Sequence, residues 1–541
     1  MKLPIPVALG QRRSKFYLLL VLLALGLAFG AYRYWHRLPH YQGVSPLQVD
    51  LRHPEMLLAT RNLADLPKAI AATPVLAGLV DEELVFHYEE DEARLSIEGT
   101  LRRLAYEHDL DLADHFLASL LAAPAEIGLW RSGKGRPEHF VAKLERGTLG
   151  KLAEALARIA GDDRQLKQAG KFSLAGDEVT LYTLDYGAGR TLAFAGRGEN
   201  WVFLSDPRLA LDEEGQLSGD AEAVLGDLLD GGHPWQASLP YAKSAQHSLV
   251  IGKAAFALDY GHFLPALAGL RLDHENGSWR AALRLDTKYL PGGHDTAAIW
   301  RALPLGAAFC SALPVDWSAA RAPLAALLGN DAASEPTLAA LDPIAAVCWY
   351  ADSRLAAPLF VARSGKELPP GAGPLLAQLA EKAWSAKAEP VASQDDKNPI
   401  YVATVASRHG LRQESGSERA FPVALARHRE LIFFSPDRRL VDAALAVAAK
   451  RAAALGDEPG LAGAGWLVVD PALVARLLRA EVQEVLPADE ESFFREVARS
   501  RLWPRLEAWG KQQTAAVAVP GPADGDGFLA LEFKALKGSG R

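Results

Sequence analysis

The sequence predicts an α+β protein in which a single N-terminal transmembrane helix is followed by two related, duplicated halves built on antiparallel sheets. Three observations predict this class. The composition, with 49% hydrophobic and 23% charged residues among 541, is that of a folded globular chain. One uncharged run, residues 16–32, is just long enough to cross a bilayer. Two long stretches then repeat one order of strand-like and helix-like segments, which favours α+β layers over a regular βαβ wind.

The composition also excludes several classes of protein. With only two cysteines and no heptad or collagen-like period, the chain is not a disulfide scaffold, a coiled coil or a triple helix. Its apolar content excludes disorder as the global state. The formal net charge of −8 gives no electrostatic reason to expect nucleic acid as a partner. The length alone predicts about three or four domain-sized units.

The run FYLLLVLLALGLAFGAY, residues 16–32, is interpreted as a membrane anchor. Basic residues before it outnumber those shortly after it, which predicts a cytoplasmic N-terminus and a C-terminal body outside the cytoplasm. The Ala- and Leu-rich composition with only two methionines is typical of bacteria, so the outside compartment is expected to be the periplasm. A cleaved signal peptide is the alternative, but Ala28-Phe29-Gly30 is a poor cleavage site. No other uncharged run of about 18 residues exists, which predicts a single-pass inner-membrane protein. The basic residues are Lys2, Arg12, Arg13 and Lys15 before the run, and Arg33 and Arg37 after it.

The region between the anchor and the repeats, residues 33–125, is predicted to be juxtamembrane and mainly helical, with a strand-like interruption. Apolar residues recur at helical spacing over residues 59–80 and again over residues 101–122. Between these stretches, ELVFHYEE and ARLSIEG alternate as the strands of a β-hairpin do.

The duplication is predicted from two matched pairs of segments. EIGLWRSGKGRPEHFVAKLERG resembles AAVCWYADSRLAAPLFVARSGK, with Trp130 aligned to Trp349 and Phe140 aligned to Phe360. Later, ENWVFLSDPRLALD resembles RELIFFSPDRRLVDAAL, and in both an apolar strand leads into a helix. Sequence identity is weak, so the shared order carries the prediction of a pseudo-symmetric pair of domains.

These observations divide the chain into six expected segments. The segments are a cytoplasmic tail at 1–15, the anchor at 16–32, the mainly helical region at 33–125, a first α+β repeat at 126–314, a helical linker at 315–343 and a second α+β repeat at 344–541.

The two cysteines, Cys310 and Cys348, lie in similar apolar runs, AAFCSALP and AAVCWYA. In an oxidising periplasm they could form a disulfide. The alternative is a pair of small buried hydrophobic residues. The sequence leaves both interpretations open.

No catalytic or metal-binding motif stands out. The chain lacks G-x-S-x-G, H-E-x-x-H, paired C-x-x-C, and S-x-x-K with its partner motifs. GLWRSGKG places Gly128, Gly133 and Lys134 at phosphate-loop spacing, but Gly135 follows where a Ser or Thr must hold Mg²⁺. A hairpin turn is the stronger interpretation of that stretch. We therefore assign no catalytic, cofactor-binding or metal-ligating residue and expect no cofactor.

Two weaker features recur near helix or strand starts. Ser205 and Ser435 occupy matched positions and could contact a ligand, but Ser beside Pro and Asp is typical of a helix N-cap. The segment 524–527, Asp-Gly-Asp-Gly, could coordinate a cation, but Asp-Gly before an alternating run is the ordinary hairpin signal.

The twelve tryptophans are scattered and are expected in cores or at sheet edges.

Two further features carry charge. His108 and His115 lie seven residues apart among acidic neighbours and share one helix face, and an exposed polar face is a stronger interpretation of them than a metal site. A dense acidic run could bind Ca²⁺ but lacks the spacing of a calcium loop, which favours a solvated hairpin. That run contains Asp81, Glu82, Glu83, His87, Glu89, Glu90, Asp91 and Glu92.

The layout resembles one bacterial family, the YfaA-like proteins of unknown function. The resemblance rests on the tail, the anchor, the acidic hairpin, RRLAYEHDLDLADHFLASLL, EIGLWRSGKGRPEHFVAKLERG and WVFLSDPRLALD, and it covers nearly the whole chain. It implies a periplasmic protein encoded beside bacterial α2-macroglobulins and a peptidoglycan-synthase-like protein. It implies no catalytic residues, because the family has none established.

The function expected from these features is that of a non-enzymatic scaffold or binding module, anchored in the inner membrane through residues 16–32. Its expected partners are bacterial α2-macroglobulin or peptidoglycan-synthase-like envelope proteins. One alternative is an enzyme acting on cell-wall or peptide substrates through an unrecognised site, because absent motifs exclude only known solutions. Another is a carrier of a hydrophobic ligand, which needs a continuous apolar cavity.

Overall fold

The computed structural model describes part of the chain, and all structural statements below concern that part. No helix in it is long and apolar enough to cross a membrane. The predicted anchor, at residues 16–32, lies outside it. The described residues are 45–73, 100, 122–131, 137–145, 160, 163, 165–174, 176–186, 190–257, 266–286, 296–315, 317, 340–355, 357–364, 388–391, 400–406, 420–461, 465–485 and 496–536.

The chain divides into two compact units, and the strands of each are described in turn. The first takes the described residues of 45–53, 100 and 139–234, and the second takes the others. The sheet of the first unit is antiparallel, with the strand order β4-β5-β6-β7-β3. These strands are β3 Pro137–Glu145, β4 Leu166–Leu174, β5 Asp177–Asp185, β6 Thr191–Arg197 and β7 Asn200–Leu204.

Helix α7, Gly219–Leu229, belongs to the first unit and packs near β7. Ser218 begins the helix, because its hydroxyl accepts a hydrogen bond from the Ala221 amide at 3.3 Å. The buried residues of the helix recur at three- and four-residue spacing, which forms one apolar face. They are Ala221, Val224, Leu225, Leu228 and Leu229.

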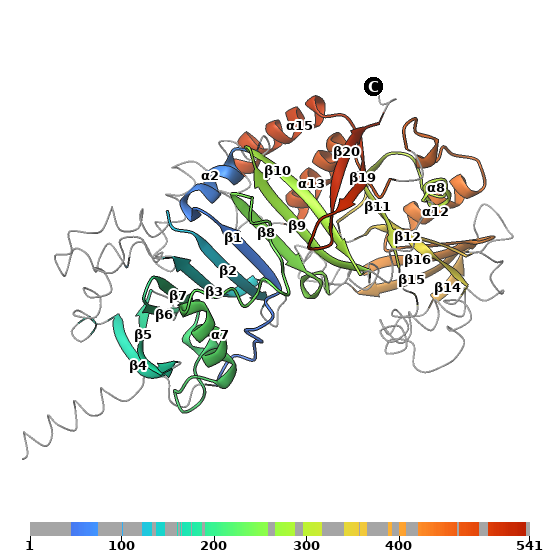
Figure 1. The fold of residues 1–541 in the computed structure, drawn as a ribbon. Helices are drawn as coiled ribbons and strands as arrows, with labels where there is room; N and C mark the ends of the chain where they lie inside the picture. Colours follow the sequence, from blue (N-terminus) through green and yellow to red (C-terminus); the bar gives the residue numbers. More distant parts are fainter. Residues whose placement is uncertain are drawn as a thin grey trace, which may run out of the picture. The chain divides into compact units, whose positions relative to one another are not determined.

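The second unit begins with five neighbouring antiparallel strands in the order β2-β1-β8-β9-β10 (Figure 1). Strand β1 pairs with β2 on one side and with β8 on the other, which makes it an inner strand of the sheet. The strands are β1 Met56–Thr60, β2 Ala125–Arg131, β8 His247–Gly252, β9 Leu267–Glu275 and β10 Ser278–Leu285.

Strand β10 then pairs with the last strand of the chain, β20, through three residue pairs centred on Leu283 and Leu529. From there the sheet continues as β20-β19-β18-β11-β12-β13-β17-β16-β15-β14. These strands are β11 Ala307–Pro314, β12 Leu341–Tyr350, β13 Leu359–Ser364, β14 Ala388–Val391, β15 Ile400–Ala406, β16 Ala420–His428, β17 Leu431–Ser435, β18 Leu467–Val469, β19 Ala516–Ala523 and β20 Phe528–Ala535.

The strand orders of the two halves of the sequence correspond. In the first half they are β4-β5-β6-β7-β3 and β2-β1-β8-β9-β10. Adding ten to each strand number gives the orders of the second half, β14-β15-β16-β17-β13 and β12-β11-β18-β19-β20. A helix also follows the seventh strand of each set, α7 in the first and α12, Arg438–Ala448, in the second.

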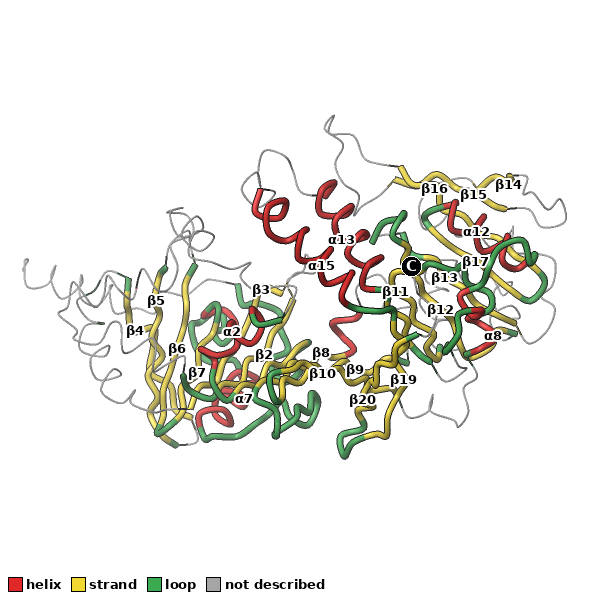
Figure 2. Tube along the Cα trace, turned by 90° about the horizontal axis from the view of Figure 1, so that it is seen from above, coloured by secondary structure: helices red, strands yellow, loops and turns green. Residues whose placement is uncertain are grey.

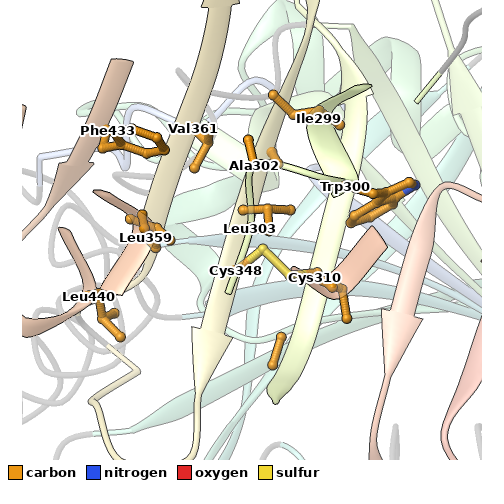
Figure 3. Close-up of a cluster of buried hydrophobic side chains, with 14 of the residues drawn as sticks. Ile299, Trp300, Ala302, Leu303, Cys310, Cys348, Leu359, Val361, Phe433 and Leu440 are labelled. Carbon is orange, nitrogen blue, oxygen red and sulfur yellow. A yellow bond between two sulfur atoms is a disulfide. The ribbon is translucent and has the colours of Figure 1, made fainter. Parts of the chain in front are cut away.

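A disulfide joins Cys310 of β11 to Cys348 of β12. The two residues face each other directly in the strand register, with their Cα atoms 4.1 Å apart, and both are fully buried. Figure 3 shows the bond among Leu303, Leu359 and Trp300 in the core between this sheet and its helices. Of the two interpretations left open by the sequence, the structure has the disulfide.

Two helices near the end of the chain, α13 Pro471–Val485 and α15 Trp503–Gln512, lie against each other (Figure 2). They approach closely at Gly510, where an added Cβ would meet the Cα of Ala472 at 2.8 Å. Trp503 and Leu506 are buried in this contact with Ala475. A glycine at 510 is therefore what allows the two backbones to come together.

The mixture of antiparallel sheet and helices fits the predicted α+β class, and the alternating run expected after residues 524–527 is strand β20. Strand β1 was not predicted, because helical spacing was read from residue 59 onward. Of that stretch the structure describes residues 59–73, and there the helical elements are α2, Leu66–Ala71, and a preceding turn of 3-10 helix. The second helical stretch of that region and its acidic hairpin lie outside the described residues, as does most of the expected linker at 315–343.

Replacing both cysteines, with Cys310→Ala and Cys348→Ala, is expected to lower the free energy of unfolding by about 4 kcal/mol. The cross-link joins residues 38 positions apart and restricts the unfolded chain accordingly. Denaturant titration followed by fluorescence measures the difference. Dithiothreitol should destabilise the wild-type chain and leave the double variant unchanged; equal stability of the oxidised and reduced wild type would show that the bond contributes nothing.

Candidate functional site

Polar side chains occupy both faces of the sheet at β8, β9 and β10. Ser248, Asp273 and Arg280 are direct cross-strand neighbours on one face. The next residues along each strand point to the opposite face, because side chains alternate along a strand. His247, His274 and Trp279 therefore form a second row behind the first.

The first face contains an open pocket of about 570 Å³. Its floor is formed by β9, β10 and β20, and its walls are the segment 236–244 and the turn between β19 and β20. The pocket thus lies where β10 meets β20. Its lining residues are Gln236, Tyr241, Ala242, Lys243, Ser244, Arg271, Asp273, Glu275, Arg280, Ala281, Ala282, Pro522, Asp524, Asp526, Phe528 and Ala530.

Arg271 is the central group of this pocket. Its side chain is 8% exposed, and its guanidinium lies over the Phe528 ring, 4.4 Å from the ring centroid. Nε donates to Asp273 Oδ2 at 2.8 Å, and Nη2 donates to Asp524 Oδ2 at 2.6 Å. Nη1 is buried and has no hydrogen-bond partner. An unmet buried donor costs about 1–3 kcal/mol, and among the described residues nothing offsets that cost for this nitrogen.

The two carboxylates that bind Arg271, those of Asp273 and Asp524, accept further hydrogen bonds that fix their positions. Asp273 accepts a hydrogen bond from the buried Ser248 hydroxyl at 2.6 Å. Asp524 accepts bonds from the backbone amides of Asp526 and Phe528, at 3.0 and 2.9 Å. The guanidinium is therefore fixed by two anchored anions, which leaves Nη1 in a defined position.

The charges of this network shift its pKa values. Burial alone lowers the pKa of Arg271, but the hydrogen bonds and charges of Asp524 and Asp273 outweigh it and raise that pKa. Burial alone raises the pKa of Asp524, but the bonds from Arg271 and from backbone amides outweigh it and lower that pKa. Both groups are therefore held in their charged forms at neutral pH.

This arrangement is suited to binding. The Ser248 hydroxyl donates a hydrogen bond to Asp273 and the residue is 1% exposed, so its oxygen is not presented to a substrate. No histidine shares its face of β8, since the neighbouring His247 points the other way. The serine, acid and histidine therefore do not form a nucleophilic triad.

The row on the opposite face is a buried histidine pair. His247 and His274 are 0% and 6% exposed, and their ring centroids lie 5.4 Å apart. Thr60 Oγ1 lies 2.7 Å from His247 Nδ1, and Trp279 packs against His274 at 5.0 Å between ring centroids. His247 Nε2 and His274 Nδ1 have no hydrogen-bond partner. Within the described part of the chain, no group of three or more potential metal ligands occurs.

The interpretation of Ser205 and Ser435 as N-caps is wrong in detail. The caps are Asp206 and Asp437, whose carboxylates accept from the amides of Arg208 and Arg439 at 2.8 and 3.0 Å. Ser205 directly follows β7 and comes one residue before its cap, and Ser435 is the last residue of β17 and comes two residues before its cap. Ser205 Oγ accepts from the Phe140 amide, and Ser435 Oγ accepts from the Asp437 amide.

The segment 524–527 forms the predicted hairpin turn between β19 and β20, with Gly527 at a φ of 79°. Its Asp524 has a second role that the sequence did not reveal, because it binds Arg271. Gly128 lies inside strand β2 rather than at the start of a phosphate loop. His108, His115 and the acidic run of residues 81–92 lie outside the described residues.

Sequence reasoning missed the pocket residues and the histidine pair. Nothing in their local spacing marks them, because Arg271 and Asp524 are far apart in the chain and His247 and His274 are single residues within apolar strands. The alternation in RLDHENGSWR, where charged residues interrupt the face of a buried strand, is the one usable signal.

The free energy of unfolding should fall as the pH is lowered below about 6.5. Burial, and then the nearby charge of His274, lowers the pKa of His247, while Asp65 acts weakly in the opposite sense. The unfolded chain therefore takes up a proton that the folded chain does not. The loss per pH unit approaches about 1.4 kcal/mol for this group at most.

Denaturant titration at pH 8, 7, 6 and 5 measures this dependence in wild type and in His247→Gln. The variant should show a shallower decline below pH 6.5. Parallel curves for wild type and His247→Gln would contradict the prediction.

Comparison with known proteins identifies the family of the chain. A solved structure described as "Structure of crystal form III of TP0453" aligns at a TM-score of 0.22 and 10% identity, over 46% of this chain and 81% of that one, a similarity too low to carry an argument. "Uncharacterized protein YfaA" of Escherichia coli (strain K12) is 31% identical over 493 residues, 86% of each chain. The profile of a family described as "Uncharacterized protein conserved in bacteria (DUF2138)" matches residues 22–533. The predicted resemblance is thus confirmed, and the chain belongs to this YfaA-like bacterial family of unknown function.

Proposed function

We propose that the protein is a non-enzymatic binding module of the bacterial envelope, anchored in the inner membrane with its body in the periplasm. The observation that carries the binding role is the pocket around Arg271. Its buried ionic groups are fixed by one another and by backbone amides, while one buried donor, Nη1, lacks an acceptor. Such a site is preorganised to hold a ligand and offers no activated nucleophile.

Two features support the envelope location. The uncharged run of residues 16–32, with more basic residues before it than after it, favours an anchor whose C-terminal side is outside the cytoplasm. The buried Cys310–Cys348 disulfide favours an oxidising compartment, since disulfides are rare in a reducing cytosol.

We also infer that the chain arose by internal duplication. The support is the correspondence of strand orders, in which every strand of the first half has a counterpart ten numbers later. A second support is the recurrence of an Asp cap two residues before a paired Arg, Asp206 with Arg208 and Asp437 with Arg439. The proposed partners, an α2-macroglobulin or a peptidoglycan-synthase-like protein, rest on the family resemblance alone.

The hydrophobic-carrier alternative is less well supported by the described residues. An apolar cavity lies between the sheet of the first unit and α7, bounded by residues such as Leu181, Leu204 and Leu225. Its volume is about 10 Å³, no more than the space of one water molecule. An acyl chain needs far more room than that.

The anchor and its orientation can be tested with C-terminal reporter fusions of the full chain. Alkaline phosphatase, which is active only in the periplasm, should be active, and green fluorescent protein should be dark. Replacing Arg12, Arg13 and Lys15 with Gln removes the excess of basic residues before the run and should lower phosphatase activity. A bright fluorescent fusion with an inactive phosphatase fusion would refute the proposed topology.

Partner binding can be tested by affinity purification of the tagged full chain from detergent-extracted envelopes of its own host. An α2-macroglobulin or a peptidoglycan-synthase-like protein should co-purify with it. The control carries residues 1–44 joined to an unrelated folded body, so that only the anchor is shared. Equal recovery of these proteins with the control would show that the body does not bind them.

A further inference from the structure

We propose that the pocket around Arg271 binds a small zwitterion, an amino acid or short peptide whose free α-carboxylate and α-ammonium are both recognised. This ligand assignment rests on the binding role proposed above and does not depend on the anchor or on the protein partners. The pocket volume, about 570 Å³, lies within the usual range for small-molecule sites.

The carboxylate end is assigned to Arg271. Its Nη1 carries the unpartnered N–H groups, and the guanidinium plane is held by Asp273, Asp524 and the ring of Phe528. A fixed, planar guanidinium matches the geometry of a carboxylate and loses little freedom on binding it. Lys243, exposed on the wall segment, adds a second cation at the rim, and its ammonium has no hydrogen-bond partner among the described residues.

The ammonium end is assigned to the acidic rim. Asp526, in the turn between β19 and β20, lines the pocket, and its carboxylate accepts no hydrogen bond from the described residues. Glu275, at the end of β9, accepts from the Ser244 hydroxyl at 2.8 Å and keeps its other oxygen 3.6 Å from Arg280. These carboxylates are suited to an ammonium group.

The mixture of charges decides the ligand class. The pocket combines cations, Lys243, Arg271 and Arg280, with anions, Asp273, Glu275, Asp524 and Asp526. A multiply charged anion such as phosphate would meet four carboxylates, and a simple cation would meet three basic groups. A ligand that carries one charge of each sign can avoid both repulsions.

The position of the pocket supports the same conclusion. Arg271 and Asp273 come from the first half of the sequence, whereas Asp524, Asp526 and Phe528 come from the last hairpin. Small-molecule sites are frequent at such junctions, because two separate elements supply converging polar groups. The two ends of one small ligand can thus contact both halves.

Isothermal titration calorimetry on the full-length chain in mild detergent tests the assignment with alanyl-alanine as the probe. We expect saturable binding. N-acetyl-alanine, which lacks the ammonium, and alanine amide, which lacks the carboxylate, should each bind at least about 10-fold more weakly. Inorganic phosphate should bind no better than these. Undetectable binding of alanyl-alanine, or equal binding of N-acetyl-alanine, would overturn the proposal.

Variants at the rim locate the binding to this pocket. Arg271→Gln should weaken binding by roughly 10- to 100-fold. Because its loss leaves two carboxylates without their partner and can unfold the site, Lys243→Gln and Asp526→Asn are needed as well. These exposed positions should each weaken binding at least severalfold with an unchanged unfolding curve. Lys534→Gln and Glu532→Gln, exposed on β20 outside the pocket lining, are the matched controls.

The outcomes separate this inference from the proposed function. Wild-type affinity in both rim variants would overturn the pocket as the zwitterion site, whatever the result of the envelope purification. Co-purification of an envelope protein with no binding of alanyl-alanine would leave the module a binding protein and reject this ligand class.

Discussion

Three backbone pairs between β10 and β20 hold the sheet of the second unit together. Every buried N–H and C=O must find a partner, so the two sets of strands can form one sheet only if their edge strands meet. The register at Leu283 and Leu529 fixes that meeting and brings the turn after β19 over the side chains of β9. The pocket exists because of this seam, since neither set of strands supplies its lining alone.

Arg271 reinforces the seam at the level of side chains. It starts on β9, crosses the ring of Phe528 and ends on Asp524, so one side chain links the first half of the sequence to the last hairpin. Burying the Arg271 guanidinium costs free energy because the cation loses its hydration, and the two carboxylates of Asp273 and Asp524 offset that loss. Replacing such a triad with apolar residues can be neutral for stability, so the triad is not by itself evidence of a gain in stability.

The sequence predicted local structure better than it predicted the site. The Asp-Gly pairs at 524–527 and the alternating run that follows them identified β20 and the turn that leads into it, because periodicity and turn chemistry are local properties. The N-caps were misplaced by one or two residues, since Ser and Asp can serve equally well in isolation. Arg271, Asp524 and the histidine pair could not be predicted, because their proximity depends on strand register between residues far apart in the chain.

The short seam also gives ligand binding a structural consequence. Only three residue pairs join β10 to β20, whereas β9 and β10 pair along their whole length, so the seam is a weak point in the backbone ladder of this sheet. A ligand that contacts Arg271 and Asp526 binds only when β9 and the last hairpin are docked. By mass action, that ligand stabilises the docked state in proportion to its affinity for it. A binding module built in this way couples occupancy of a small pocket to the integrity of the whole sheet, and such coupling requires no chemistry beyond the binding itself.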